Sequence, residues 1–225
     1  MPAFRPETQA LLFDLDGTLI DSDPDHLVAF QEVFAPYGIA LDHALYTSHI
    51  MGASNAMIGE RFLAHLPADE RAAVFEAKEA AFRERLRVAT PTLGAPELLA
   101  YAGARGLPLA VVTNAPRANA EKALAAIGLA ELLPILVIGG ELARPKPDPL
   151  PYLTALELVG ASAEKTVAFE DSLSGVQAAV AAGLAVVGVT TGLPADRLIE
   201  AGAVLAAEDF RDPRIYELIA AKAAS

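Results

Sequence analysis

The chain has 225 residues, of which 53% are hydrophobic and 20% charged, which is enough apolar material to bury a sizeable core. It contains no cysteine, which excludes disulfides, thiolate metal ligands and cysteine nucleophiles. The net charge of −12 argues against partners such as nucleic acid or an anionic membrane. The start of the chain lacks a signal-peptide pattern and no apolar run is long enough to span a membrane, so we expect a cytoplasmic protein.

Short apolar runs recur along the chain and predict strands that are buried on both faces, as in a parallel sheet. In chain order they cover residues 10–13, 107–113, 133–138, 165–169 and 185–189, with 203–205 as a candidate sixth. Helical patterns lie between them, at 95–105, 118–127, 150–159 and 173–182. This alternation predicts an α/β fold with a doubly wound, mostly parallel, Rossmann-like sheet.

The segment from residue 21 to residue 91 interrupts this alternation, because it is charged, largely helical in pattern and without a convincing strand. We expect it to form a small all-helical cap domain over the carboxyl edge of the sheet, with hinges at 21–24 and 90–96. Residues 1–20 and 92–225 would then form the α/β catalytic core. The alternative is that these helices pack on the sheet like the others.

Polar residues or glycines follow four of the predicted strands. The first strand ends in Asp14 and Asp16, two carboxylates so close that they repel unless a cation or a shared proton intervenes. The others end in Thr113 and Asn114, in Gly139 and Gly140, and in Glu170 and Asp171. Because ligands bind beyond the carboxyl ends of the strands in such sheets, we expect the polar side chains to converge on one site.

The string FDLDGTLIDSD around Asp14 resembles the first motif of the haloacid dehalogenase-like superfamily, which is DxDGT after a buried strand. Thr113, Lys146 and the pair Glu170 and Asp171 match its other three motifs in order. The resemblance covers essentially the whole chain outside the predicted cap and implies a magnesium-dependent phosphoric monoester hydrolase. Dehalogenases of this superfamily lack the second aspartate, so its presence favours phosphate esters.

The resemblance implies a role for each motif residue. Asp14 would attack phosphorus and become an aspartyl phosphate, and Asp16 would act as general acid and base with a raised pKa. Thr113 and Lys146 would bind the transferring phosphoryl group, with Asn114 as a further donor.

The implied cofactor is Mg²⁺, a cation that prefers hard oxygen ligands. Asp14 and Asp171 would bind it directly, together with the backbone carbonyl of Asp16. Glu170 would bind it either directly or through water. His43, His49 and His65 form no metal-ligand pattern.

Three further residues flank the motifs. Ser172 and Ser174 suit the N-terminus of the following helix. Arg117 fits either the site or the surface equally well.

The start of the predicted cap, DSDPDH, resembles the branch that includes β-phosphoglucomutase and hexose phosphatases. Ser22 matches a hydroxyl residue near the mutase site, His26 a hinge histidine and Lys78 a phosphate-binding lysine. The stretch 51–55 resembles the loop that sets specificity, where this chain has Asn55 and the mutase has an arginine. These four residues are candidate substrate-binding residues.

An asparagine cannot replace an arginine as a clamp for a second phosphate. We therefore favour a phosphatase whose partner is a small phosphorylated metabolite, such as a sugar or polyol phosphate. The alternatives are a phosphosugar mutase, a phosphoglycolate phosphatase and a non-catalytic binding protein on the same fold. We expect a monomer or a weak homodimer.

Overall fold

A computed structural model describes residues 8–51, 53–86 and 89–220 of the chain. Three earlier expectations therefore fall partly outside the described residues. These concern the signal-peptide region at 1–7, Gly52 in the predicted specificity loop, and residues 87–88 near the end of the predicted cap.

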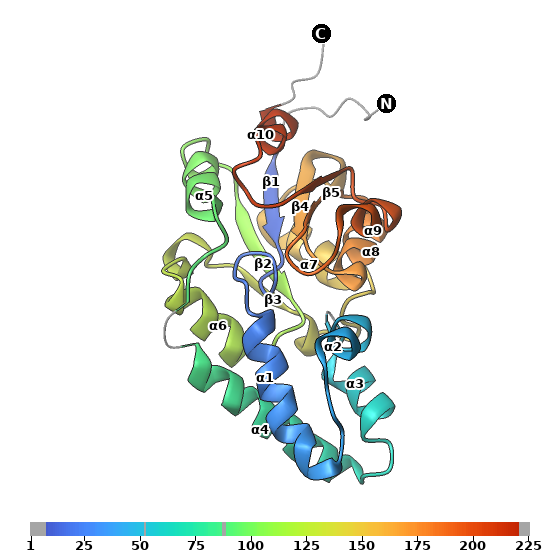
Figure 1. The fold of residues 1–225 in the computed structure, drawn as a ribbon. Helices are drawn as coiled ribbons and strands as arrows, with labels where there is room; N and C mark the ends of the chain where they lie inside the picture. Colours follow the sequence, from blue (N-terminus) through green and yellow to red (C-terminus); the bar gives the residue numbers. More distant parts are fainter. Residues whose placement is uncertain (1–7, 52, 87–88, 221–225) are drawn as a thin grey trace.

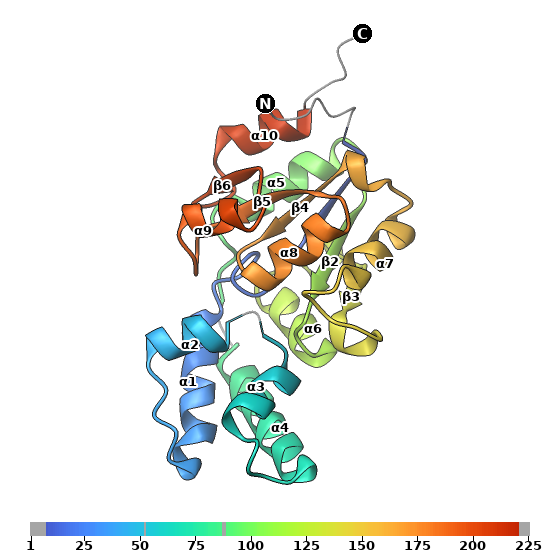
Figure 2. The same ribbon diagram turned by 90° about the vertical axis from the view of Figure 1, so that its right-hand side faces the viewer.

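A six-stranded sheet forms the centre of the molecule (Figures 1 and 2). Its strands are β1 (Ala10–Phe13), β2 (Leu109–Thr113), β3 (Leu136–Ile138), β4 (Thr166–Glu170), β5 (Ala185–Val189) and β6 (Leu205–Ala207). All neighbours pair in parallel, in the order β3-β2-β1-β4-β5-β6. The chain order reverses between β1 and β4, which is the point where open α/β sheets bind their ligands.

Helices cover both faces of this sheet, which makes a three-layer structure (Figure 2). One face packs against α5 (Ala95–Gly103), α6 (Arg117–Ala126) and α10 (Pro213–Ala220). The other packs against α7 (Leu150–Val159), α8 (Leu173–Ala181) and α9 (Ala195–Glu200). Successive side chains of a strand point to opposite faces, so Leu11 and Phe13 belong to one hydrophobic cluster and Leu12 to the other.

The structure confirms the predicted fold class and shifts the ends of some strands. β3 begins at Leu136 because residues 130–132 form a short 3₁₀ helix and Pro134 has no N–H to donate to a ladder. The sixth strand lies at Leu205–Ala207 rather than 203–205, since the Ala203 N–H closes the preceding helix on the Leu198 carbonyl. Further 3₁₀ helices lie at Ala35–Tyr37, Gly139–Glu141 and Ala163–Lys165.

The described residues between β1 and α5 contain four helices and no strand of the sheet, as predicted. They are α1 (Asp23–Phe34), α2 (His43–His49), α3 (Asn55–Phe62) and α4 (Ala68–Arg85). We call this segment the helical insert. It lies beyond the carboxyl ends of the strands (Figure 1) and has a hydrophobic cluster of its own, built around Phe30, Phe34 and Phe75. Its division from the core as a separate domain stays a prediction.

The two connections to the helical insert run side by side. Ile20 and Pro91 form an isolated antiparallel bridge, and the Thr92 N–H donates to the Leu19 carbonyl at 2.9 Å. The Thr92 hydroxyl donates to the Thr18 carbonyl at 2.6 Å. The tie between the two connections therefore lies just before the predicted hinge 21–24 and within the predicted hinge 90–96.

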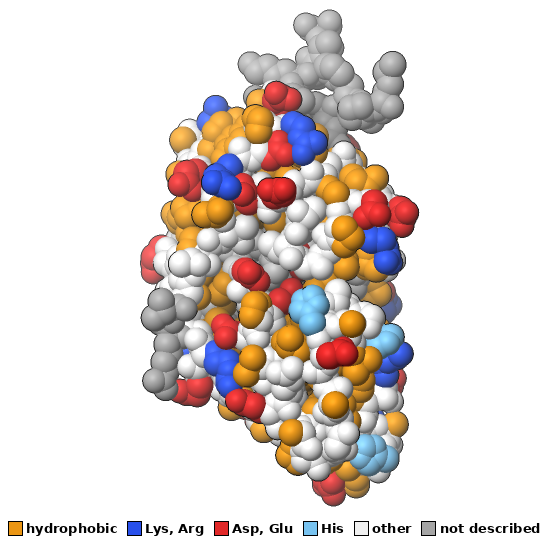
Figure 3. Space-filling model, in the orientation of Figure 1, with side chains coloured by type: hydrophobic (Ala, Val, Ile, Leu, Met, Phe, Trp, Pro, Cys, Tyr) orange, Lys and Arg blue, Asp and Glu red, His pale blue; other side chains and the backbone are white. Residues whose placement is uncertain are grey.

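None of the helices in the described part of the chain combines the length and apolar character that a membrane crossing requires. On the face drawn in Figure 3, acidic and basic side chains are interspersed with apolar ones.

Candidate active site

A partly open cavity of about 110 Å³ lies between the carboxyl edge of the sheet and the helical insert. The core contributes residues such as Asp14, Thr113 and Asp171 to its lining, and the insert contributes residues such as His26 and Lys78. Side chains from two parts of the sequence therefore enclose one small space.

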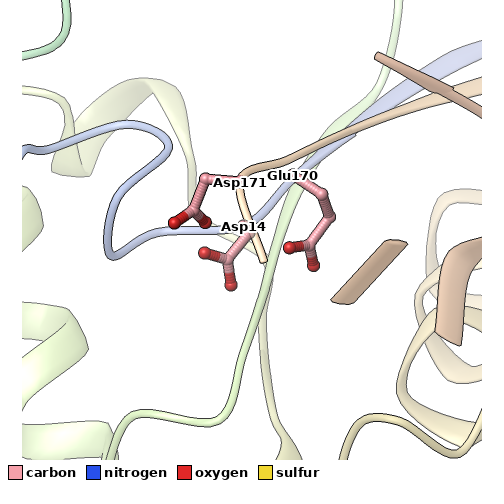
Figure 4. Close-up of side chains that lie close together, drawn as sticks. All are labelled: Asp14, Glu170 and Asp171. Atoms are coloured by element: carbon pink, nitrogen blue, oxygen red, sulfur yellow. The ribbon is translucent and has the colours of Figure 1, made fainter. Parts of the chain in front are cut away.

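Three carboxylates meet at the core side of this cavity. Asp14 follows β1, Glu170 ends β4 and Asp171 follows it, so all three lie at the point where the strand order reverses. One oxygen from each lies within 4.8 Å of the other two. Figure 4 shows the three side chains at adjoining strand ends with their carboxylates on the same side.

Two glycines make this close approach possible. Gly17 has a φ of +78°, a conformation that favours glycine, and a Cβ there would overlap the Asp171 carboxylate. Gly175, in the first turn of α8, is close enough to Glu170 that a Cβ there would overlap that carboxylate too. Each glycine therefore leaves the space that an acidic side chain occupies.

Lys146 is the buried cation that faces the acidic cluster. Its Nζ donates to Asp14 Oδ1 at 2.7 Å and to Glu170 Oε1 at 2.5 Å, and only 3% of its side chain is exposed. The Asn114 amide holds the loop in place, since it donates to the Lys146 carbonyl and accepts from the Lys146 N–H, both at 3.1 Å. Lys146 thus joins Asp14, which follows β1, to Glu170 at the end of β4, and Asn114 holds its loop.

The charges of this centre are unbalanced. Burial raises the pKa of Asp14 to about 8, a shift that Lys146 opposes and Glu170 reinforces. Burial and the charges of Asp14 and Glu170 raise the pKa of Asp171 well above its usual range. Burial disfavours the charge of Lys146, but the two carboxylates outweigh it and raise its pKa.

This imbalance fits a divalent cation. Three buried carboxylates face one ammonium, and burial together with their mutual repulsion disfavours the ionised forms of Asp14 and Asp171. A nearby cation would relieve that repulsion. The donor atoms are carboxylate oxygens, the hard ligands that Mg²⁺ prefers. The residues present therefore suit the predicted metal.

Asp16 lies at the boundary between the core and the helical insert. Its Oδ1 accepts a hydrogen bond from the Ser22 hydroxyl at 2.6 Å and lies 3.3 Å from His26 Nε2. Burial by itself would raise the pKa of Asp16, but the hydrogen bonds from His26 and from the Ser22 hydroxyl and the charge of Lys78 lower it. The prediction of a raised pKa for Asp16 is therefore wrong, because it did not include these two donors and the charge of Lys78.

The insert contributes a polar network that continues from Asp16. The Lys78 ammonium can only donate, so it donates to His26 Nδ1 at 2.9 Å, which leaves the ring proton on Nε2 facing Asp16. His26 also stacks on the Phe82 ring, with centroids 3.7 Å apart. The geometry thus fixes both the tautomer and the plane of this histidine.

The sequence is similar to known proteins over most of its length. A family model described as haloacid dehalogenase-like hydrolase matches residues 11–189. The chain belongs to this family. A validoxylamine A 7'-phosphate phosphatase of Streptomyces hygroscopicus is 34% identical over 86% of this chain and 91% of its own length. A phosphorylated carbohydrates phosphatase of Thermotoga maritima is 32% identical over 87% of this chain and 92% of its own length.

Solved structures agree with the family assignment. The crystal structure of CbbY from Rhodobacter sphaeroides in complex with phosphate superposes with a TM-score of 0.81 and 30% sequence identity. The match covers 91% of this chain and 96% of that one. The haloacid dehalogenase-like fold of this chain is therefore shown by both sequence and structure.

The predicted site residues of this family member mostly gather around the cavity. Its lining includes Asp14, Asp16, His26, Asn55, Lys78, Thr113, Asn114, Lys146 and Asp171. Ser22 and Glu170 lie behind it, as hydrogen-bond partners of Asp16 and Lys146. Their individual roles stay predictions.

Several flanking residues have structural partners, and of these Ser172 also lines the cavity, as does Ser174. The Arg117 guanidinium donates to both oxygens of Glu141 on the surface, at 2.8 and 2.7 Å. Ser172 is the N-cap of α8, as predicted, and accepts from the Gly175 N–H at 3.1 Å. His43 and His49 lie on the exposed side of α2.

Sequence reasoning missed four residues of this hydrolase. The Tyr152 hydroxyl donates to Glu170 Oε1 at 2.6 Å, and the Thr18 hydroxyl donates to Asp171 at 3.1 Å. Glu79 and Asn119 join the insert to the core, with the Asn119 amide donating to Glu79 Oε2 at 2.5 Å. Tyr152 lies in an apolar helix and Glu79 in a charged one, so neither pattern distinguishes them, whereas Thr18 is part of the DxDGT string.

Proposed function

We propose that the chain is a magnesium-dependent phosphatase that hydrolyses a small phosphomonoester of a sugar or polyol through Asp14. The observation that carries this proposal is the Asp14 carboxylate, which lies 2.7 Å from Lys146 Nζ and beside Glu170 and Asp171 in the cavity between core and insert. The relatives named as phosphatases of validoxylamine A 7'-phosphate and of phosphorylated carbohydrates support the substrate class.

Asp14 is the nucleophile in this proposal. Its carboxylate attacks phosphorus, the bond to the leaving alcohol oxygen breaks, and the phosphoryl group is carried as an aspartyl phosphate. Lys146 and Thr113 stabilise the charge on the phosphoryl oxygens, which is the main task in phosphoryl transfer. Water then attacks the same phosphorus, releases inorganic phosphate and restores the carboxylate.

Asp16 is the general acid and base. It donates a proton to the leaving alcohol in the first half of the reaction and accepts one from water in the second. Its lowered pKa favours the carboxylate, and the negative charge of an incoming phosphate favours the protonated form. The donors Ser22 and His26 hold the side chain in place for both steps.

Asp14, Asp171 and the backbone carbonyl of Asp16 would hold Mg²⁺, with Glu170 bound directly or through water. When bound, the ion neutralises charge on the phosphate and orients it against the carboxylate. The helical insert acts as a cap domain, residues 21–91, that excludes bulk water from the leaving group.

A phosphosugar mutase is the second candidate, favoured by the contacts that join Lys78, His26 and Asp16. A mutase must grip a bisphosphate intermediate, and the described residues that line the cavity include no arginine to do so. Incubation with β-glucose 1-phosphate and a bisphosphate primer separates the two. A phosphatase releases inorganic phosphate, whereas isomerised sugar phosphate with little free phosphate would favour the mutase.

The proposed function is tested with a panel of phosphorylated metabolites and magnesium, by assaying released phosphate. We expect release from at least one sugar or polyol phosphate, and its loss in Asp14→Asn. Asp69→Asn is the matched control, because this residue is exposed on the first turn of α4. Activity of Asp14→Asn close to that of the unmodified protein would exclude Asp14 as the attacking group.

A further inference from the structure

The part of the cavity that the helical insert lines is chemically distinct from the acidic cluster. It contains Asn55, Lys78 and Glu79, which are joined by hydrogen bonds. We propose that Glu79 is a specificity-determining residue, which fits the cavity to a leaving group that is neutral and hydroxylated and excludes one that carries a second anion. The inference rests on the proposed phosphatase function and narrows its substrate class.

Glu79 neutralises the lysine that would otherwise attract an anion. The Lys78 ammonium donates to both oxygens of Glu79, at 3.2 and 3.1 Å. The two side chains are only 4% and 5% exposed, so water screens their charges little. A second phosphate or carboxylate entering this region would meet a lysine that is already paired, next to a carboxylate that repels it.

No described residue of the lining offers an unpaired cation. The lining contains two lysines, Lys78 and Lys146, and no arginine among the described residues. Lys146 is bound to Asp14 and Glu170 at the opposite, core side. His26, which the insert contributes, has both ring nitrogens hydrogen-bonded, one to Asp16 and the other to Lys78. The cavity can therefore compensate the phosphate at the core side but not a second charge beside the insert.

Glu79 also sets the hydrogen-bonding character of Asn55. A carboxylate only accepts, so the Asn55 amide nitrogen must face Glu79, to which it donates at 2.9 Å. This leaves Asn55 Oδ1, which has no hydrogen-bond partner among the described residues, as an acceptor at the cavity. A sugar or polyol hydroxyl can donate to that oxygen, whereas a carboxylate or a fully ionised phosphate has no proton to donate.

Glu79 is fixed in this position from the core as well. The Asn119 amide on α6 donates to its second oxygen at 2.5 Å, and Asn119 accepts from the Arg83 guanidinium at 2.9 Å. Moving the Glu79 carboxylate to admit an anion would break bonds to three partners. The side chain that excludes a second anion therefore also joins the insert to the core.

The test uses two substrates that differ in one group. Glycerol 3-phosphate and 3-phosphoglycerate carry the same phosphate ester, and the second has a carboxylate in place of a hydroxymethyl group. We expect the unmodified protein to favour glycerol 3-phosphate in kcat/KM by about 100-fold, and Glu79→Gln to reduce that ratio by about tenfold or more. The matched control Glu70→Gln, at an exposed position of the same helix, should keep the ratio.

A double variant separates charge from shape. Lys78→Gln combined with Glu79→Gln removes both charges, so the ratio should return to within about threefold of the unmodified protein even though the overall rate falls. Equal activity of the unmodified protein on both substrates, or an unchanged ratio in Glu79→Gln, would overturn the inference and leave the phosphatase proposal standing. A ratio in the double variant as low as in Glu79→Gln would also overturn it. Absence of phosphate release from the whole metabolite panel would instead overturn the proposed function, and with it this inference.

Discussion

Replacing Lys146 with methionine tests the charge balance of the acidic cluster. The change keeps the length of the side chain but removes the cation that binds Asp14 and Glu170. All three side chains are at most 10% exposed, so the carboxylates left behind cannot regain full hydration. We expect the folded chain to lose stability because two buried negative charges lose their partner.

The size of this loss follows from the geometry. Two unit charges 2.7 Å apart attract by about 6 kcal/mol at an effective dielectric constant of about 20, and desolvation of both groups offsets much of that. Removing one partner of a buried ion pair costs roughly 3–5 kcal/mol. For a chain of this length that lowers the Tm by about 6–20 °C.

The assay is thermal unfolding in magnesium-free buffer at about pH 9, followed by circular dichroism, because Asp14, with a pKa of about 8, is mostly ionised there. The pKa of Lys146 is raised in the folded chain, so its stabilising contribution is fully present below its usual value of 10.5 and is lost only at higher pH. Arg144→Met is the control, because this cation lies in the same loop with 67% of its side chain exposed and should contribute below about 1 kcal/mol. A Tm of Lys146→Met equal to that of Arg144→Met would refute the reasoning.

Three further substitutions test other contacts. Gly17→Ala should lower kcat/KM by about 100-fold or more, measured by phosphate release, because its Cβ would overlap the Asp171 carboxylate; normal kinetics would contradict this. Tyr152→Phe should lower the free energy of unfolding by about 1.5–3 kcal/mol in urea titration, since its hydroxyl donates to the buried Glu170 carboxylate, whereas Tyr37→Phe at an exposed position should not. Asn119→Ala should speed amide hydrogen exchange in α4 but not in β1, because it removes bonds to Glu79 and Arg83; equal protection in α4 would argue against this contact.

The motifs at the strand ends could be predicted because local sequence determines them. A short apolar run followed by DxDGT predicts a buried strand, a turn and an acidic pair without knowledge of the partners. The parallel sheet then brings Asp14 and Asp171 together, although about 150 residues separate them, since the carboxyl ends of the strands share one edge.

Contacts between the helical insert and the core could not be predicted in this way. Glu79 looks like one of many charges on α4, and only the packing of α4 against α6 places it beside Asn119. The pKa of Asp16 was mispredicted for the same reason, because its donors Ser22 and His26 come from the connection to the insert and from α1. Such contacts depend on tertiary packing, which no local pattern in the sequence encodes.

Trapping the phosphorylated enzyme tests the central claim most directly. The protein is mixed with magnesium and a substrate identified by the panel, quenched, and treated with borohydride, which reduces an acyl phosphate to an alcohol. Peptide mass spectrometry then locates the modified residue. The proposed mechanism predicts homoserine at position 14, only when substrate and magnesium are both present. Rapid phosphate release without homoserine at any position, or with homoserine at a different aspartate, would contradict it.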